Sequence, residues 1–379
     1  MLLKGIKILD LSALLPGPMC TLFLADLGAD VIKIENLNGD PMRYFEATKQ
    51  LNNQSPYFVA LNRNKKSIAI NLKASEGKSI FMKLAKNADV IIEGFRPGKV
   101  DALGIGYKTI KKINPRIVYC SISGYGQKGT YKNRAGHDIN YVSLSGLLDV
   151  MHNKPFVPGV QIADVGSALI AAFAIMSALF YCEKYDKGNY IDLSVLDSAF
   201  SFIGMHIAHG SVPRNPKTAL SGIAPCYNIY ETKDRKFVSL GAIERKFWQA
   251  FCNAIKRKDL IKKQYDSSTE LIKEVQNIFK KKTIKELVDL NNKYDFCCEP
   301  VKKIEDVVKD EHIKSRKLLV ENDGVKQVAM PIIFSALKKI HYSRAPKLGE
   351  HTKNILKDIG YSTRHIQELK SKKVILCLI

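Results

Sequence analysis

Short apolar runs alternate with helical patterns along the first half of the chain, and this alternation constrains the fold more than any other feature. Residues 6–11 are typical of a buried strand, Pro16 begins a helix that ends at Gly28, and residues 31–35 are a second strand pattern. The order recurs, with strands expected over 67–72, 89–93, 116–123 and 190–194, and helices over 75–87, 109–114 and 196–209. The sequence therefore predicts an α/β domain with a parallel sheet covered by helices.

The pattern changes after residue 210. Residues 211–221 are polar and punctuated by proline and glycine, which predicts a linker. Residues 222–325 carry one strand pattern and several amphipathic helical patterns, which predict a smaller α+β domain. We expect the large domain to span 1–210 and to be completed by about 326–379, with a last helix over 363–370.

The charge balance is strongly basic, with 59 Lys and Arg against 37 Asp and Glu and a net charge of +22. Such a balance suits nucleic acid, an acidic membrane or a small phosphorylated ligand. Nucleic-acid binding is disfavoured because the lysines are spread through helical stretches without interleaved aromatic residues. We expect no nucleic-acid partner.

The eight cysteines show no CxxC spacing and no disulfide framework, which predicts reduced thiols and a cytoplasmic protein. No secretory signal is evident. Adjacent Cys297 and Cys298 cannot easily share one ion, and no third ligand stands nearby, so no metal is expected.

Residues 165–182 contain no charge, and this length touches the threshold for a membrane-spanning helix. The run is diluted by glycine, serine and alanine, and no loop charges set a topology. A helix that is apolar all round can also lie between a sheet and a partner helix or subunit. We expect a buried helix and no membrane span.

Residues 124–129 match GxGxxG and follow a strand, a pattern that is typical of dinucleotide-binding sites. The polar residues 130–134 follow in place of the helix that would hold a pyrophosphate. The glycines are better explained as a loop beside an active site.

Three ionisable residues have structural explanations when taken singly. His137 ends the glycine loop, Asp164 stands where an N-cap of the uncharged helix is expected, and Glu244 follows a strand as a helix N-terminal acid. None of them alone identifies a site.

Seven motifs in order resemble the family III CoA-transferases (CaiB/BaiF), and the resemblance runs nearly end to end. They are LKGIKILDL at 3–11, ADLGADVIKIE at 25–35, NRNKKS at 62–67, EGFRPG at 93–98, SGYG at 123–126, GNYID at 188–192 and LGEH at 348–351. The resemblance implies a Rossmann-like large domain plus a smaller α+β domain in an interlocked homodimer. It also implies an acyl-CoA thioester as substrate, a role in fatty acid metabolism, and no cofactor beyond the coenzyme A of that substrate.

Within the family, GHDINY at 136–141 resembles the α-methylacyl-CoA racemase branch. The resemblance makes His137 and Asp164 the two catalytic bases, and Glu244 the carboxylate that orients His137, from either subunit. Inverting a carbon beside a thioester needs a base on each face and oriented donors for the enolate oxygen. Backbone N–H groups at the start of the Asp164 helix are candidate donors.

The same resemblance leaves a transferase open, in which Asp164 is a nucleophile that carries the acyl group. A basic protein that binds acyl-CoA or nucleic acid without turnover is a third reading. His137 decides the subclass, because the histidine is normally absent from the transferases.

The resemblance also assigns the coenzyme A contacts. The phosphates of the coenzyme suit a basic protein. One position departs from the racemase pattern, since Asn36 stands where an arginine is common, and Arg43 is a candidate replacement. The implied contacts are Ile70, Asn71, Leu72, Lys73, Arg96, Gly136, Asp138, Ile139, Asn140 and Tyr141.

Overall fold

A seven-stranded sheet organises the first part of the chain. The computed structural model describes residues 1–51, 53–151, 154–211, 218–337 and 340–377. The strand order is β12-β3-β2-β1-β4-β5-β6, and every neighbouring pair is parallel except β12 with β3. The strands are β1 (Lys7–Leu11), β2 (Asp30–Glu35), β3 (Lys65–Ile70), β4 (Val90–Glu93), β5 (Val118–Ser123), β6 (Asn189–Ser194) and β12 (Ile375–Leu376). The predicted parallel α/β fold is confirmed, in the doubly wound order 3-2-1-4-5-6.

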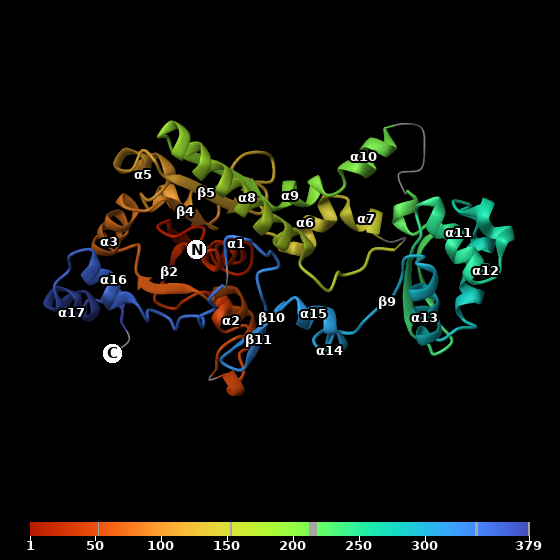
Figure 1. Ribbon diagram of the computed structural model, residues 1–379. Coiled ribbons are helices and arrows are strands. Elements are labelled where there is room, and N and C mark those ends of the chain that lie inside the picture. Colours follow the sequence, from red (N-terminus) through yellow and green to blue (C-terminus); the bar gives the residue numbers. More distant parts are fainter. Residues whose placement is uncertain (52, 152–153, 212–217, 338–339, 378–379) are drawn as a thin grey trace. The chain divides into compact units, whose positions relative to one another are not determined.

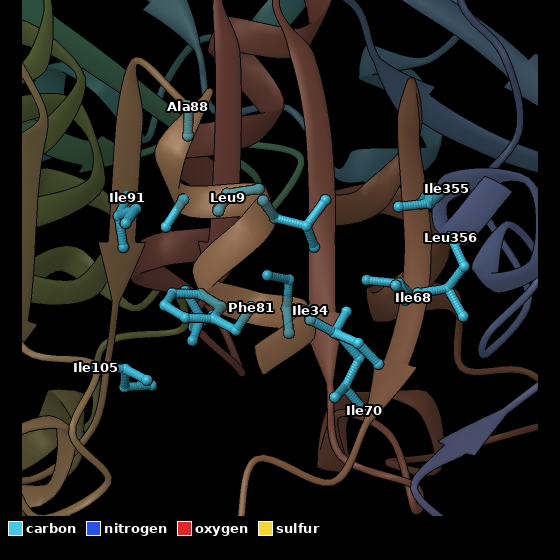
Figure 2. Packing of buried hydrophobic residues seen from close by; sticks show 14 of the residues in the cluster. Leu9, Ile34, Ile68, Ile70, Phe81, Ala88, Ile91, Ile105, Ile355 and Leu356 are labelled. Atoms are coloured by element: carbon cyan, nitrogen blue, oxygen red, sulfur yellow. The ribbon is translucent and has the colours of Figure 1, made fainter. Parts of the chain in front are cut away.

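One face of the sheet is covered by α3 (Ser75–Lys86), α5 (Tyr107–Ile113), α16 (Thr352–Asp358) and α17 (Thr363–Ser371). Ile80, Phe81, Leu84 and Ala85 recur at helical spacing on α3 and pack on strand residues such as Leu9. Figure 2 shows this layer, with Ile355 and Leu356 of α16 beside Ile68 of β3. The C-terminal helices therefore complete the core of the first domain.

The opposite face carries a buried ionic network below α1 (Pro16–Asp26). Asp10 lies between Leu9 and Leu11, so it points away from the apolar layer. Lys65 Nζ lies 3.3 Å from Asp10 Oδ2, and Thr21 donates to the same carboxylate at 2.5 Å. Burial acts to raise the pKa of Asp10, but the charges of Lys65 and Lys33 hold it below its usual value.

Lys33 connects this network to two loops. Its ammonium group lies 2.9 Å from Asp40 Oδ2 and donates to the Ser12 carbonyl at 2.9 Å. Asp40 Oδ1 in turn accepts from the N–H of Leu14 at 3.2 Å. Leu14 has a φ of 66°, a left-handed backbone conformation that residues other than glycine rarely adopt. The network thus holds the loop after β1 in a specific shape.

The uncharged run forms α8 (Ile162–Tyr185), which contacts α1, β5 and β6 (Figure 1). Within this single chain the helix is buried on one side only, so the expected burial of its other side against a partner helix or subunit stays a prediction. Leu169, Phe173, Met176 and Phe180 recur every three or four residues and are exposed, with Phe173 at 74% and Phe180 at 73%. Within the described part of the chain, α8 alone is long and apolar enough to span a membrane, and a single such helix is weak evidence because core helices share this composition.

The remaining helices of the first part are short. They connect the strands and line the sheet's carboxyl end. The predicted helix over 196–209 is two helices, separated at residues 202–203. The bounds in the first unit are α2 (Pro56–Asn62), α4 (Lys99–Ala102), α6 (Asp138–Leu144) and α9 (Val195–Ser201), whereas α7 (Leu147–Met151) and α10 (Gly204–Gly210) belong to the second unit.

A second compact unit has its own core. Its antiparallel sheet contains β7 (Tyr227–Glu231), β8 (Phe237–Gly241) and β9 (Cys298–Pro300). Trp248, Phe251, Phe279 and Phe296 are buried against it, and the Trp248 indole donates to the Leu260 carbonyl at 2.9 Å. The helices are α11 (Arg245–Ala254), α12 (Thr269–Phe279) and α13 (Ile284–Tyr294), with α14 (Ile304–Val307) following β9. The predicted smaller α+β domain is confirmed as a fold.

The observed division differs from the expected boundaries. The first unit contains residues 1–145, 157–201 and 314–379, and the second contains 146–156 and 202–313. Residues 314–325 belong to the first unit because the hairpin of β10 (Leu319–Asn322) and β11 (Val325–Val328) packs on α2. α15 (Glu311–Ser315) spans this boundary. Residues 212–217 of the expected linker lie outside the described residues.

We predict that Asp10→Ala lowers the free energy of unfolding by about 3–5 kcal/mol, because it leaves the Lys65 ammonium buried without its carboxylate. Chemical denaturation at pH 7 measures the loss. Arg364→Ala is the control, because the Arg364–Glu368 pair is exposed, with 91% of the arginine side chain accessible, and such pairs contribute less than about 1 kcal/mol. Equal effects of the two variants would contradict the structural role given to the network.

Candidate functional site

Two adjoining cavities open at the carboxyl ends of the parallel strands. One has a volume of about 350 Å³ and the other about 540 Å³. Ser12, Ala13 and Phe95 line both, and they follow β1 and β4, the neighbours at which the strand order reverses. Ligands of doubly wound sheets bind at this position because the loops after the two strands diverge there.

His137 and Asp164 line the same cavity, the smaller of the two, which we call the catalytic cavity. His137 is the N-cap residue of α6, and Asp164 is the third residue of α8. Its walls also include Gly17, Gly94, Gly124, Gly136, Tyr141 and Val195. The structure thus places the two predicted bases on one cavity, although they come from different helices.

The position of His137 is held by its neighbours in the loop. The side-chain oxygen of Asn140 accepts from the His137 N–H at 3.0 Å, and the Tyr141 hydroxyl donates to the Gly136 carbonyl at 2.7 Å. The imidazole itself is on an exposed residue that faces the cavity. Asn140, predicted to contact coenzyme A, therefore acts within the loop.

The rings of two tyrosines explain why glycine stands at Gly124 and Gly136. A Cβ at Gly136 would lie 2.7 Å from the hydroxyl of Tyr125 and 2.8 Å from the ring of Tyr141. A Cβ at Gly124 would collide with the Tyr141 hydroxyl. These glycines let the loop approach the tyrosines closely, and no dinucleotide is needed to explain them. The chain after the glycine loop forms no helix until Asp138, as predicted.

Asp164 is half-buried, and its carboxyl group is perturbed. Burial raises its pKa to about 7, and the nearby charge of Asp138 adds to the shift. The predicted N-cap role of Asp164 is wrong, because α8 begins at Ile162 with Gln161 as N-cap residue. Asp138 accepts from the N–H groups of Ala163 and Asp164 at 2.8 and 3.0 Å. Those two N–H groups are therefore not free to stabilise an enolate, contrary to expectation.

Three cations and one phenol also face the catalytic cavity. Arg96, Lys132 and Arg134 line it, and the sequence had indicated only Arg96, as a coenzyme A contact. Burial raises the pKa of Tyr141 to about 12, with the charge of Asp164 contributing. The cavity can therefore attract an anion, and it contains a carboxyl group, Asp164, that exchanges its proton near neutral pH.

A buried carboxyl group supports the loop between the cavities. Glu93 ends β4, and its side chain accepts from the N–H of Phe95 at 2.8 Å. Burial raises the pKa of Glu93 to about 7. The contact fixes the turn that brings Phe95 into both cavities.

The larger cavity of this pair contains the predicted stretch Ile70, Asn71, Leu72 and Lys73. It also contains Asn36 and Lys99, and Lys99 was missed because a lone lysine after Pro97-Gly98 carries no signal in sequence. Arg43 is not a replacement for a phosphate contact at Asn36. Its guanidinium is buried, pairs with Glu35 at 2.7 Å and donates to the Pro346 carbonyl.

Four predicted residues lie outside these two cavities. Asp138, Ile139 and Asn140 line neither of them. Glu244 belongs to the second unit, where it is the exposed N-cap residue of α11. Its pairing with His137 stays a prediction. No cluster of three or more His, Cys, Asp or Glu side chains within the described ranges could hold a metal ion.

The second unit contains a separate cavity of about 910 Å³. Its lining is largely apolar and includes Met151, Phe202, Leu220, Tyr227, Ile229 and Leu240, with His206 and Asn228 among the polar side chains.

The doubly wound sheet, the paired cavities at its switch point and the two titratable side chains define an α/β enzyme. The model of CoA-transferase family III matches residues 3–352. The chain belongs to this family, which confirms the resemblance of the seven motifs.

Relatives of both activities are similar over nearly their whole length. Human α-methylacyl-CoA racemase is 32% identical, with 99% of this chain and 98% of that protein aligned. Human succinyl-CoA:glutarate CoA-transferase is 34% identical, with 98% of this chain and 90% of that protein aligned. A crystal structure of a CaiB/BaiF family protein from Brucella suis superposes with a TM-score of 0.82 at 28% identity, covering 94% of this chain and 99% of that one.

Proposed function

We propose that the protein is a racemase that interconverts (2R)- and (2S)-2-methylacyl-CoA. The observation that carries the proposal is the pairing of His137 and Asp164 on one cavity. Similarity to the human racemase supports it. The two residues come from different segments of the chain and line the same cavity, which is compatible with two bases that act on one carbon.

The chemistry is a proton transfer in each direction. One base removes the α-proton, and the electron pair of the C–H bond forms the enolate of the thioester. The other residue, in its protonated form, then delivers a proton to the opposite face. With its pKa raised to about 7, Asp164 exists in both forms near neutral pH, as a residue that alternates between base and acid must.

The enolate oxygen needs donors other than the first N–H groups of α8, which Asp138 occupies. The N–H groups of Asp138 and Ile139 lie next to His137 in the chain. No acceptor for either is found among the residues that the structure describes. They are backbone candidates by their place beside His137 in the chain, although neither residue lines the catalytic cavity, and Arg134, which lines it, is a cationic candidate.

We predict that the protein incorporates deuterium at the α-carbon of (2R)-2-methylacyl-CoA in deuterated water, with loss of optical purity and no added acid acceptor. His137→Ala should slow racemisation about a hundredfold or more, since a general base contributes about 10²–10⁴-fold. The control is His365→Ala, an exposed histidine on α17. Racemisation that survives His137→Ala would contradict the assigned role.

A CoA-transferase is the second candidate, and two observations favour it. Arg96, Lys132 and Arg134 beside Asp164 suit a carboxylate acceptor, and the human transferase is as similar as the racemase. In this reaction Asp164 attacks the thioester and releases the coenzyme A thiolate, which then attacks the aspartyl carbonyl of the anhydride, frees the first acid and leaves an aspartyl-CoA thioester. The second carboxylate attacks this thioester and displaces the thiolate, which takes the second acyl group as a new thioester and returns Asp164 as a free carboxylate. No exchange with solvent, together with transfer that requires a second carboxylate and a covalent adduct on Asp164, would establish it.

The larger cavity of the pair is proposed as the coenzyme A site. Lys73 and Lys99 supply cations there, and Asn71 supplies an amide. Lys99 takes the phosphate contact for which Arg43 is unavailable, since Arg43 is paired with Glu35.

We predict that Lys99→Ala weakens coenzyme A binding about tenfold, because a hydrogen bond to a charged group contributes about 1.5 kcal/mol. The salt dependence of the dissociation constant should also become less steep. Isothermal titration calorimetry at two salt concentrations measures both. Lys256→Ala, a lysine of the second unit, is the control, and an unchanged affinity for Lys99→Ala would exclude this contact.

The expected homodimer is also a proposal. The apolar stripe of Leu169, Phe173, Met176 and Phe180 on α8 supports it, because exposed aromatic side chains at helical spacing favour burial by a second chain.

We predict a two-chain mass by analytical ultracentrifugation, and a shift to single chains in Phe173→Glu, since a charge in the stripe opposes its burial. Ile304→Glu is the control, because Ile304 is 83% exposed on α14 and lies outside the stripe. A single-chain mass for the unaltered protein would rule the dimer out.

A further inference from the structure

A carboxylate from α6 reaches across to cap α8. Asp138 Oδ1 accepts from the Ala163 N–H at 2.8 Å and from the Asp164 N–H at 3.0 Å. The side chain comes from a residue 26 positions earlier in the chain, and Asp138 is only 9% exposed. Because the N–H of Asp164 is one of the two groups it holds, Asp138 positions the backbone of the candidate catalytic residue directly.

The contact also places a second carboxylate beside Asp164. The charge of Asp138 disfavours the ionised form of Asp164, and it acts in addition to burial. Burial raises the pKa of Asp138 itself, and the backbone N–H groups that it accepts from oppose this rise by stabilising its negative charge. Asp138 therefore caps α8 with its carboxylate, and its charge helps to raise the pKa of the neighbouring Asp164.

The other groups around Asp164 are few. His137 and Tyr141 face the cavity from α6, and Lys132 and Arg134 face it from the preceding loop. Arg96 faces it from the loop after β4, while α1 contributes Pro16 and Gly17 and the start of α9 contributes Val195, none of them charged. Among the described residues no ion pair to Asp164 is formed, and the charge of Asp138 opposes its ionisation.

We propose that Asp138 is a positioning residue that holds Asp164 by capping α8 and sets the pH at which Asp164 changes between base and acid. This role rests on the proposed racemase function and deepens it. A racemase must use Asp164 as a base on one enantiomer and as an acid on the other. Both uses proceed at similar rates only when neither form of Asp164 is scarce at the working pH.

Two variants separate the cap from the charge. Asp138→Asn keeps a side-chain oxygen for the two N–H groups and removes the negative charge, whereas Asp138→Ala removes both. Asp358→Asn, an exposed residue at the end of α16, is the control for a single lost charge.

The pH profile of α-deuterium exchange is measured for each enantiomer. For the one that Asp164 deprotonates, the acidic limb reports Asp164, and for the other the alkaline limb does. In Asp138→Asn both limbs should move to lower pH by about one unit, because a like charge has been removed. Asp358→Asn should leave all four limbs in place.

Asp138→Ala should show the same pH shift and a further loss of kcat of about tenfold, because the first turn of α8 loses its cap as well. If Asp138→Asn leaves the Asp164 limbs where they are, the proposed role is overturned. A purely structural role would lower kcat at every pH without moving a limb.

The Asp164 carboxyl group can also be titrated without turnover, by ¹³C NMR of labelled protein against an Asp164→Asn reference. Its midpoint should fall in Asp138→Asn. If the unaltered protein shows no exchange but this midpoint still falls, the racemase function fails while the link between the two carboxylates stands. An unchanged midpoint refutes the link whatever the activity.

Discussion

The buried network around Asp10 and Lys65 is the interaction on which the site depends. It joins β1, β2 and β3 at the face below α1, where Lys33 extends it to Ser12 and Asp40. Charges at this depth are stable only when each has a partner, so the loops that carry the partners are held with them. Ser12 belongs to both cavities, and the left-handed Leu14 beside it is held by Asp40. The buried network therefore fixes the loops that shape the two cavities.

Two helices, α6 and α8, provide the candidate catalytic side chains of the catalytic cavity. α6 provides His137 and Tyr141, and α8 provides Asp164. Asp138 ties the two together by capping α8 from α6, so the relative position of the candidate bases follows from one side chain. The neighbouring carboxylates also separate in role, because one accepts backbone N–H groups and the other is left partly desolvated.

Part of the protein's positive charge lines the two cavities. Lys73 and Lys99 line the larger cavity of the pair, and Arg96, Lys132 and Arg134 line the catalytic one. The first pair suits the phosphates of coenzyme A. The second group suits either an enolate or a carboxylate acceptor, which is why the same pocket is chemically compatible with both activities found among the relatives. Under the proposed function, His137 is the residue that would distinguish the two activities.

The sequence alone determined the elements, the parallel sheet, the family and the candidate pair His137 and Asp164. The elements could be predicted because apolar periodicity and proline or glycine boundaries are signals carried by neighbouring residues. The family could be predicted because several motifs in the same order are more specific than any single motif. Only the tertiary structure decided that Asp138 caps α8, that Arg43 forms an ion pair with Glu35 and that Lys99 lines a cavity. It also decided that α8 exposes Phe173 and Phe180. These facts depend on which distant segments meet, and no pattern along the chain encodes the partner of a single charged side chain.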